Sequence, residues 1–281
     1  MLKQRIMTAI VMLAILLPTV FYPNPLAFGA LAVVLIAAGA WEWAKLNQCG
    51  KATSLAVAGL CAGICLVSWS AGMLQAPLHL LWTLAGAAWV VLGAWLLRGG
   101  VKAWSAVPKG IRLCGGVIAL WIAWLAVAQA RIMGINFLFS VLVLVWIADI
   151  FAYFAGRAFG GRFFTRKLAP SISPGKTWEG VCGGMAGVLL CAFVWRALDV
   201  AGAADQASVY SRMGAVSPAF MVLGVVFLAT MSVVGDLVES LFKRSAGVKD
   251  SSGLLPGHGG VLDRVDALLP ILPLAMMLGT L

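Results

Sequence analysis

The densest group of polar side chains in this sequence lies between Asp236 and Asp266, after a long hydrophobic stretch. Carboxylates supply oxygen ligands to a hard divalent cation, and Lys and Arg side chains bind phosphate. Backbone N–H groups of a glycine turn can also approach an anion closely. These residue types predict metal-assisted chemistry on a phosphate compound at a membrane surface. The group comprises Asp236, Glu239, Ser240, Lys243, Arg244, Lys249, Asp250, His258, Gly259, Gly260, Asp263, Arg264 and Asp266.

The first part of this group has helical spacing. Its side chains share one helix face, because they follow one another at three- and four-residue intervals. An alternative without function is an intrahelical salt bridge from Glu239 to Lys243. After a tight turn rich in Pro and Gly, Asp263 and Asp266 fall three residues apart at the start of a helix, where carboxylates suit the helix dipole and can reach a metal. For His258 we expect a structural or phosphate-binding role rather than that of a general base.

A second polar group lies between Asp149 and Gly180, inside one apolar stretch and in the loop that follows it. Acids inside a membrane span are candidates for function, and Ser, Thr and Lys in the loop could hold a phosphate. Gly175 opens a Gly-Lys-Thr triplet, but Pro170 stands where a phosphate-binding P-loop requires glycine, and no strand precedes it. The candidates of this group are Asp149, Tyr153, Ser173, Lys176 and Thr177.

Composition shows what must position these residues. Hydrophobic residues make up 62% and charged residues 11% of the 281-residue chain, whereas soluble domains carry roughly 25% charged residues. The sequence predicts an all-α, polytopic bundle of about nine transmembrane helices. The predicted spans are residues 6–22, 26–46, 55–71, 78–97, 114–130, 134–155, 180–200, 219–241 and 265–281.

The net charge of +10 follows the predicted topology. With the N-terminus in the cytosol, all but three of the 20 cations fall on the cytosolic side, and the exceptions are Arg131, Arg196 and Arg212. The positive charge is therefore explained by orientation and by anionic headgroups or substrates, and no nucleic acid is expected as a partner.

The chain divides into two unequal regions. Residues 1–130 contain a single acid, Glu42, which we expect at an interfacial aromatic belt as a snorkelling or paired carboxylate. Residues 131–281 carry the other acids and form the predicted catalytic region with its cytosol-facing site. Glycines four residues apart, from Gly180 to Gly187, predict close helix packing within the bundle or in a dimer.

The 27 residues Ser240–Asp266 resemble, position for position, the signature of the phosphatidate cytidylyltransferases (CDP-diacylglycerol synthases). The pattern is Ser-x-Phe-Lys-Arg-x4-Lys-Asp-x-Ser-x2-Leu-Pro-x-His-Gly-Gly-Val-x-Asp-Arg-Val-Asp, and the stretch from Asp149 to Gly180 resembles the family's DxxAYxxGRxFG and SPxKTWEG motifs. Residues 1–130 match mainly as hydrophobic spans.

The resemblance implies an enzyme of a bacterial inner membrane, commonly a homodimer, whose cytosolic site converts CTP and phosphatidic acid to CDP-diacylglycerol and pyrophosphate. It implies Mg²⁺ as cofactor, Asp236 and Asp263 as its ligands, and a second cation such as K⁺. Asp236, Lys243, Asp263 and Asp266 are then the catalytic candidates, and the other residues of the two groups are candidates for substrate binding.

Two other functions remain as alternatives. A transporter of an anionic substrate would use the buried acids as coupling-ion sites, but transporters tend to carry broken helices in both halves, and here the polar groups crowd into one half. A CTP-dependent membrane lipid kinase would act on the same substrate class and release CDP instead of pyrophosphate.

Overall fold

The computed structural model describes residues 2–202, 204 and 206–281, and most of them form helices. Over these residues there are two isolated β-bridges and no strands, so the predicted all-α class is confirmed. The helices are α1 Leu2–Phe21, α2 Leu26–Leu46, α3 Lys51–Ser70, α4 His79–Ala106, α5 Lys109–Met133, α6 Ile135–Phe159, α7 Trp178–Val200, α8 Val209–Val216, α9 Pro218–Ser245, α10 Leu262–Val265 and α11 Leu268–Gly279.

Eight of these helices are long and apolar enough to cross a membrane, and they correspond to the first eight predicted spans. The ninth predicted span, residues 265–281, differs. It contains α11, a helix of 12 residues, whereas a membrane-spanning helix needs about 20. Pro270 and Pro273 lie in this helix. The polar helix α10 ends at Val265, so α11 cannot be extended by another turn toward the N-terminus.

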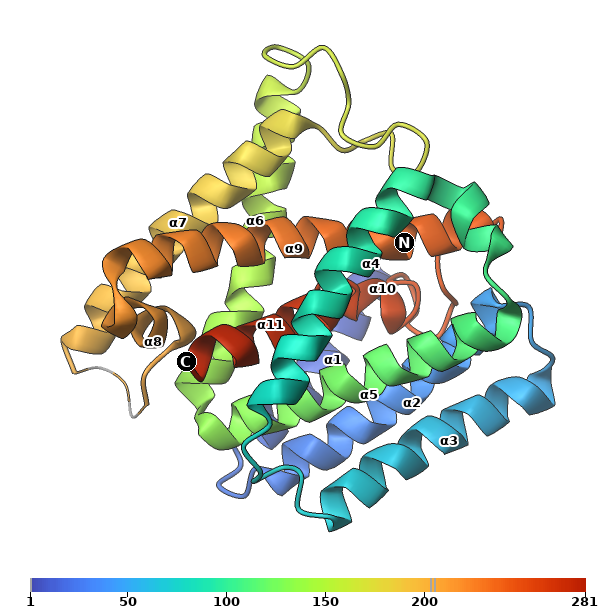
Figure 1. Cartoon of the computed structure of the whole chain (residues 1–281), viewed down its shortest axis with the longest axis horizontal. Coiled ribbons are helices and arrows are strands. Elements are labelled where there is room, and N and C mark those ends of the chain that lie inside the picture. Colours follow the sequence, from blue (N-terminus) through green and yellow to red (C-terminus); the bar gives the residue numbers. More distant parts are fainter. Residues whose placement is uncertain (1, 203, 205) are drawn as a thin grey trace.

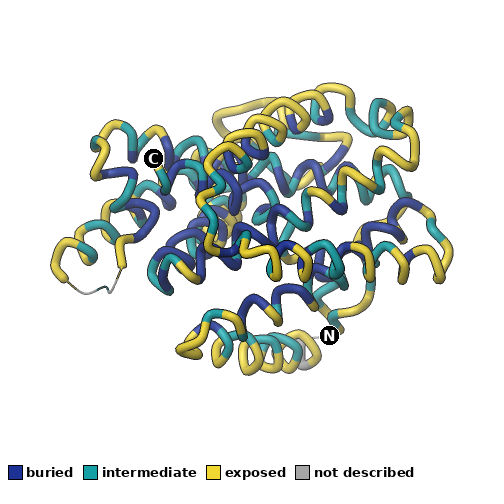
Figure 2. The backbone as a smooth tube through the Cα atoms, turned by 60° about the horizontal axis from the view of Figure 1, so that its bottom comes forward, coloured by how far each residue is buried: buried dark blue, intermediate teal, exposed yellow. Residues whose placement is uncertain are grey.

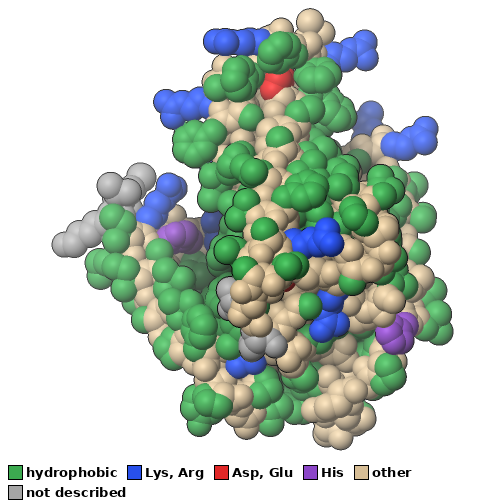
Figure 3. All heavy atoms as spheres, turned by 90° about the vertical axis from the view of Figure 1, so that its left-hand side faces the viewer, with side chains coloured by type: hydrophobic (Ala, Val, Ile, Leu, Met, Phe, Trp, Pro, Cys, Tyr) green, Lys and Arg blue, Asp and Glu red, His purple; other side chains and the backbone are tan. Residues whose placement is uncertain are grey.

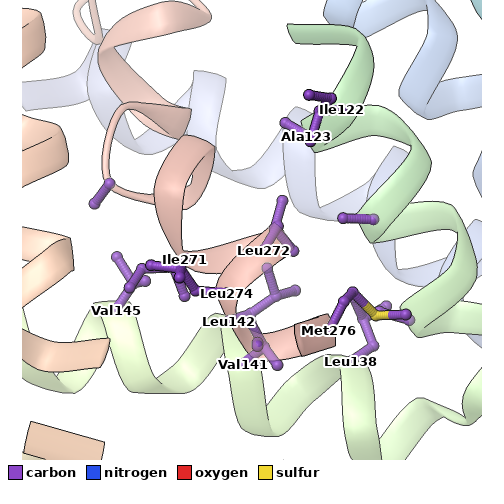
Figure 4. Close-up of a cluster of buried hydrophobic side chains, with 14 of the residues drawn as sticks. Ile122, Ala123, Leu138, Val141, Leu142, Val145, Ile271, Leu272, Leu274 and Met276 are labelled. Atoms are coloured by element: carbon purple, nitrogen blue, oxygen red, sulfur yellow. The ribbon is translucent and has the colours of Figure 1, made fainter. Parts of the chain in front are cut away.

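Helix α11 forms the centre of the bundle, with α4, α5 and α9 packed around it (Figure 1). A helix that is apolar on all sides must be buried, and most of α11 is. Figure 4 shows its Ile271 and Leu274 among side chains of α5 and α6, such as Ala123 and Val141. This packing fixes α11, and with it the polar segment that immediately precedes it.

Helices α6 and α7 form a closely packed hairpin that projects from the bundle, with residues 160–177 connecting its ends (Figure 1). The glycines from Gly180 to Gly187 face α6: a Cβ on Gly184 would lie 2.9 Å from the Ala148 carbonyl oxygen. Of the two uses predicted for these glycines, the structure shows packing within the bundle. Helix α1 is the least buried of the candidate membrane spans and lies at the periphery of the bundle, with most of its residues exposed (Figure 2).

The loops predicted to share one side of the membrane lie at the same end of the bundle. Arg5 Nε donates to the Gly257 carbonyl at 2.9 Å, Lys109 Nζ to Gln48 at 2.9 Å, and Arg244 Nε to Ile172 at 3.2 Å. The face shown in Figure 3 is largely hydrophobic, and its Lys and Arg side chains project around the upper end and also lie lower on the face. Assignment of this end to the cytosol stays a prediction from the charge distribution.

Candidate active site

A cleft of about 420 Å³ opens between α6, α7 and α9 beside the loop that joins α6 to α7. Its inner part is lined by small and apolar side chains, including Ala148, Gly184, Met185 and Ala229. Polar residues also line the cleft, and the cations among them, Arg157 and Lys176, lie at or near the loop. The polar lining residues are Asp149, Tyr153, Arg157, Lys176, Thr177, Ser232 and Asp236. The cleft therefore offers apolar surface to hydrocarbon and cations to an anionic group.

The cleft cluster consists of Asp149, Tyr153, Lys176 and Asp236, four predicted site residues that the fold brings together. Lys176, from the α6–α7 loop, forms an ion pair with Asp236 of α9. The Ser240 hydroxyl, one helical turn further, donates to Asp236 Oδ1 at 3.3 Å. The side chains of Lys176 and Asp236 are 26% and 31% exposed, and both line the cleft. A phosphate can therefore compete for Lys176, and a cation for Asp236.

The loop cluster consists of Glu239, Lys243 and Asp263 with the backbone of Ser251 and Gly260. Lys243 forms ion pairs with both Glu239 and Asp263, whose Oδ1 lies 2.7 Å from its Nζ. The expected Glu239–Lys243 salt bridge is therefore present, and it is part of a larger network. Asp263 Oδ2 accepts hydrogen bonds from the N–H groups of Ser251 at 2.9 Å and Gly260 at 2.7 Å. Burial disfavours the ionised form of Asp263, but Lys243 and these N–H donors outweigh it and lower the pKa of the carboxyl.

Asp266 connects the two clusters. Burial, reinforced by the charge of Asp236, raises its pKa to about 7, while the Ala267 N–H and the charge of Lys243 act in the opposite direction. The backbone of Asp266 can come this close to α9 because residue 235 is glycine: a Cβ there would lie 2.8 Å from the Asp266 carbonyl oxygen. The carboxylates of Asp266 and Asp236 therefore repel each other, and a bound cation would reduce this repulsion.

The donor chemistry of the site fits Mg²⁺ in part. Asp236 and Asp266 offer the hard oxygen ligands that this ion prefers, and their mutual repulsion favours a bound cation. No three Asp, Glu, His or Cys side chains surround a common point in the part of the chain that the structure describes. This arrangement suits an ion that uses one or two carboxylates and takes its other ligands from water and substrate phosphates.

Among the remaining predicted residues, Thr177 lines the cleft, and the others lie outside it. Arg244 fastens α9 to the α6–α7 loop through Ile172, and the Thr177 hydroxyl accepts the Gly180 N–H at 3.1 Å as the N-cap of α7. The Ser173 N–H donates to Ala169 at 2.8 Å within the same loop. Lys249, Asp250 and Arg264 are exposed, and His258 and Gly259 form a turn in which the Leu255 N–H donates to the Gly259 carbonyl oxygen at 2.8 Å. Their predicted roles in substrate binding stay predictions.

For Glu42 of α2, the sequence predicted a snorkelling or a paired carboxylate, and the snorkelling alternative is wrong. Its side chain does not snorkel to an interface, because the residue is fully buried. It accepts hydrogen bonds from Ser252 and Val261 of the loop before α10 and from Leu262, the first residue of α10. The available signal was that Glu42 is the single acid in the first 130 residues and lies within an apolar stretch. Its partners are more than 200 residues away in the chain, and no spacing rule connects them.

Comparison with known proteins gives matches over nearly the whole chain. The model of the cytidylyltransferase family matches residues 3–281. Phosphatidate cytidylyltransferase of Pseudomonas aeruginosa is 39% identical over 97% of this chain and 95% of its own length. The enzyme of the same name from Haemophilus influenzae is 36% identical over 97% of this chain and 96% of its own. The Brucella abortus phosphatidate cytidylyltransferase is 45% identical, over 52% of this chain and 47% of its own.

Proposed function

Since the chain belongs to the cytidylyltransferase family, we propose that its cleft is the active site of a phosphatidate cytidylyltransferase. The enzyme transfers the cytidylyl group of CTP to phosphatidic acid and releases CDP-diacylglycerol and pyrophosphate. The observation that carries the assignment of the site is the mixed lining of the cleft, which combines small and apolar side chains with the cations Arg157 and Lys176. A lipid with two acyl chains and a phosphate headgroup has the matching apolar and anionic parts.

The reaction forms a bond between a phosphate oxygen of phosphatidic acid and the α-phosphorus of CTP, while the bond from that phosphorus to the β-phosphate oxygen breaks. Such transfers depend mainly on positioning and on stabilisation of charge, so no covalent nucleophile is required. Lys176 at the cleft would hold the lipid phosphate, and Lys243 with the loop cluster would neutralise the triphosphate. Asp236 would orient Lys176 through their ion pair.

Mg²⁺ is the cofactor in this proposal, and it would neutralise charge that develops on the triphosphate and the leaving pyrophosphate. Asp236 would be a ligand, and its charge helps to raise the pKa of the neighbouring Asp266. Asp263, the other ligand implied by the resemblance, has both oxygens engaged by Lys243 and the loop. Its assignment stays a prediction, as does a second cation such as K⁺.

The proposal includes a homodimer in a bacterial inner membrane, with the charged end of the bundle facing the cytosol. Residues 1–130 would anchor the protein and shape the lipid groove or dimer contact, and residues 131–281 would carry the chemistry. The transporter is disfavoured because the polar residues of the cleft and loop clusters gather at one end of the bundle.

Narrowing the apolar part of the cleft should impair lipid binding alone. Met185 lines this part on α7, so Met185→Trp is expected to raise the KM for phosphatidic acid by about five- to tenfold, the cost of losing roughly 1 kcal/mol of apolar contact. The KM for CTP should stay within twofold. Steady-state kinetics in lipid nanodiscs measure both constants. Leu190→Trp, on an exposed position of the same helix, is the matched control and should leave both unchanged. An unchanged KM for phosphatidic acid in Met185→Trp would place the lipid elsewhere.

A further inference from the structure

Glu42 is a fully buried carboxylate whose hydrogen-bond partners come from residues 251–262. Oε1 accepts the Val261 N–H at 2.9 Å and the Ser252 hydroxyl, and Oε2 accepts the Leu262 N–H at 2.8 Å. The Ser251 hydroxyl lies 3.3 Å from Oε2. Burying a charge without hydrogen-bond donors would be very costly. These hydrogen bonds offset the cost of burying the Glu42 carboxylate.

The two N–H groups that donate hydrogen bonds to Glu42 belong to the start of α10. The N-cap residue of this helix, Val261, makes no side-chain capping hydrogen bond. Free N–H groups at a helix start need an acceptor, and here another helix supplies it. Gly260 makes the approach possible, because a Cβ at this position would collide with Glu42 Oε1 and Ser251 Oγ. Both features point to a contact built for this carboxylate.

Glu42 and Asp263 together clamp the two ends of the loop. Glu42 accepts hydrogen bonds from Ser252 at the first end of the loop and from Val261 at the second. Asp263 likewise accepts hydrogen bonds from Ser251 and Gly260. The segment that Glu42 fixes leads directly into Asp263 and Asp266. Asp263 in turn holds Lys243, the cation assigned above to the triphosphate.

We propose that Glu42 is a positioning residue for the nucleotide site: it holds the loop before α10, and through Asp263 it sets the place of Lys243. The kinetic consequence rests on the proposed function, but the hold on the loop does not. The region of residues 1–130 would then contribute directly to the geometry of the active site.

Glu42→Gln keeps the size of the side chain and removes the charge and one acceptor oxygen. Hydrogen exchange of the purified full-length protein, followed by mass spectrometry, should show the amides of residues 251–262 exchanging at least about tenfold faster, because charge-assisted hydrogen bonds are lost. Kinetics should show the KM for CTP rising about tenfold, with the KM for phosphatidic acid within twofold. A protein that had merely lost folded fraction would show a lower kcat with both KM values unchanged.

Asp199→Asn is the matched control. Asp199 also accepts several hydrogen bonds, from Asn136 and Ser208 among others, at the opposite end of α7. This variant should leave exchange in residues 251–262 and the KM for CTP unchanged. Ser252→Ala removes one donor to Glu42 without disturbing the carboxylate, and should give smaller changes in the same direction if Glu42→Gln fails to fold.

Unchanged exchange in residues 251–262 of a folded Glu42→Gln or Ser252→Ala protein would overturn the proposal, as would faster exchange with an unchanged KM for CTP. Faster exchange in the variant, together with no CTP turnover by the unaltered protein, would instead overturn the proposed function and support the hold on the loop.

Discussion

Asp236→Asn is expected to lower kcat/KM by about 10²–10³-fold, the range found when one preorganised electrostatic group is removed from an active site. The variant keeps the shape of the side chain and removes its charge. Lys176 loses its ion-pair partner in the cleft, and the proposed cation loses a ligand. The loss should therefore appear in kcat as well as in KM.

Initial rates with CTP and phosphatidic acid measure this effect on protein whose folding is checked by thermal unfolding in detergent. Asp199→Asn removes a carboxylate from the other end of the bundle, and its kcat/KM should match that of the unaltered protein. Activity of Asp236→Asn within threefold of the unaltered protein would remove Asp236, and with it the cleft cluster, from the reaction.

Asp263→Asn is expected to lower kcat/KM by about 10²-fold or more, and to raise the Mg²⁺ concentration that gives half-maximal activity. Asp263 is the ligand that the resemblance implies, and it is also the acceptor for Lys243, Ser251 and Gly260. Since the variant weakens this buried network, its unfolding temperature should fall as well.

A titration with MgCl₂ separates the two roles of Asp263. A shifted Mg²⁺ requirement supports the ligand assignment. Reduced activity with an unchanged Mg²⁺ requirement would assign Asp263 to the loop alone, and full activity over the whole titration would contradict both roles.

The sequence predicted the helical class and the first eight spans, because these depend on local composition and spacing. The roles of the two groups of site residues stay predictions. The sequence did not predict which residues from the two groups would meet. Lys176 and Asp236 form an ion pair across 60 residues, and this pairing depends on how the α6–α7 loop folds back onto α9. That register is set by packing, including the close approach of α7 glycines to α6.

Two further features, the last helix and the surroundings of Glu42, also could not be predicted from the sequence. Residues 265–281 are apolar enough for a span, but hydropathy does not distinguish a membrane helix from a short helix buried in the centre of a bundle. Glu42 appeared to be an interfacial acid, because its donors lie in a distant segment and two of them are backbone N–H groups. Backbone donors carry no sequence signature, so this contact could be found only in the structure.

We expect the chain to join CTP and phosphatidic acid at this cleft. The most direct test follows pyrophosphate, CDP and CDP-lipid together, using purified protein with phosphatidic acid, CTP and MgCl₂, and Asp236→Asn alongside. We expect pyrophosphate and CDP-lipid in equal amounts, no CDP, and loss of both products on chelation and in the variant. CDP with a phosphorylated lipid would indicate a lipid kinase instead, and no product from folded protein with any nucleotide would exclude the cytidylyl transfer and favour transport.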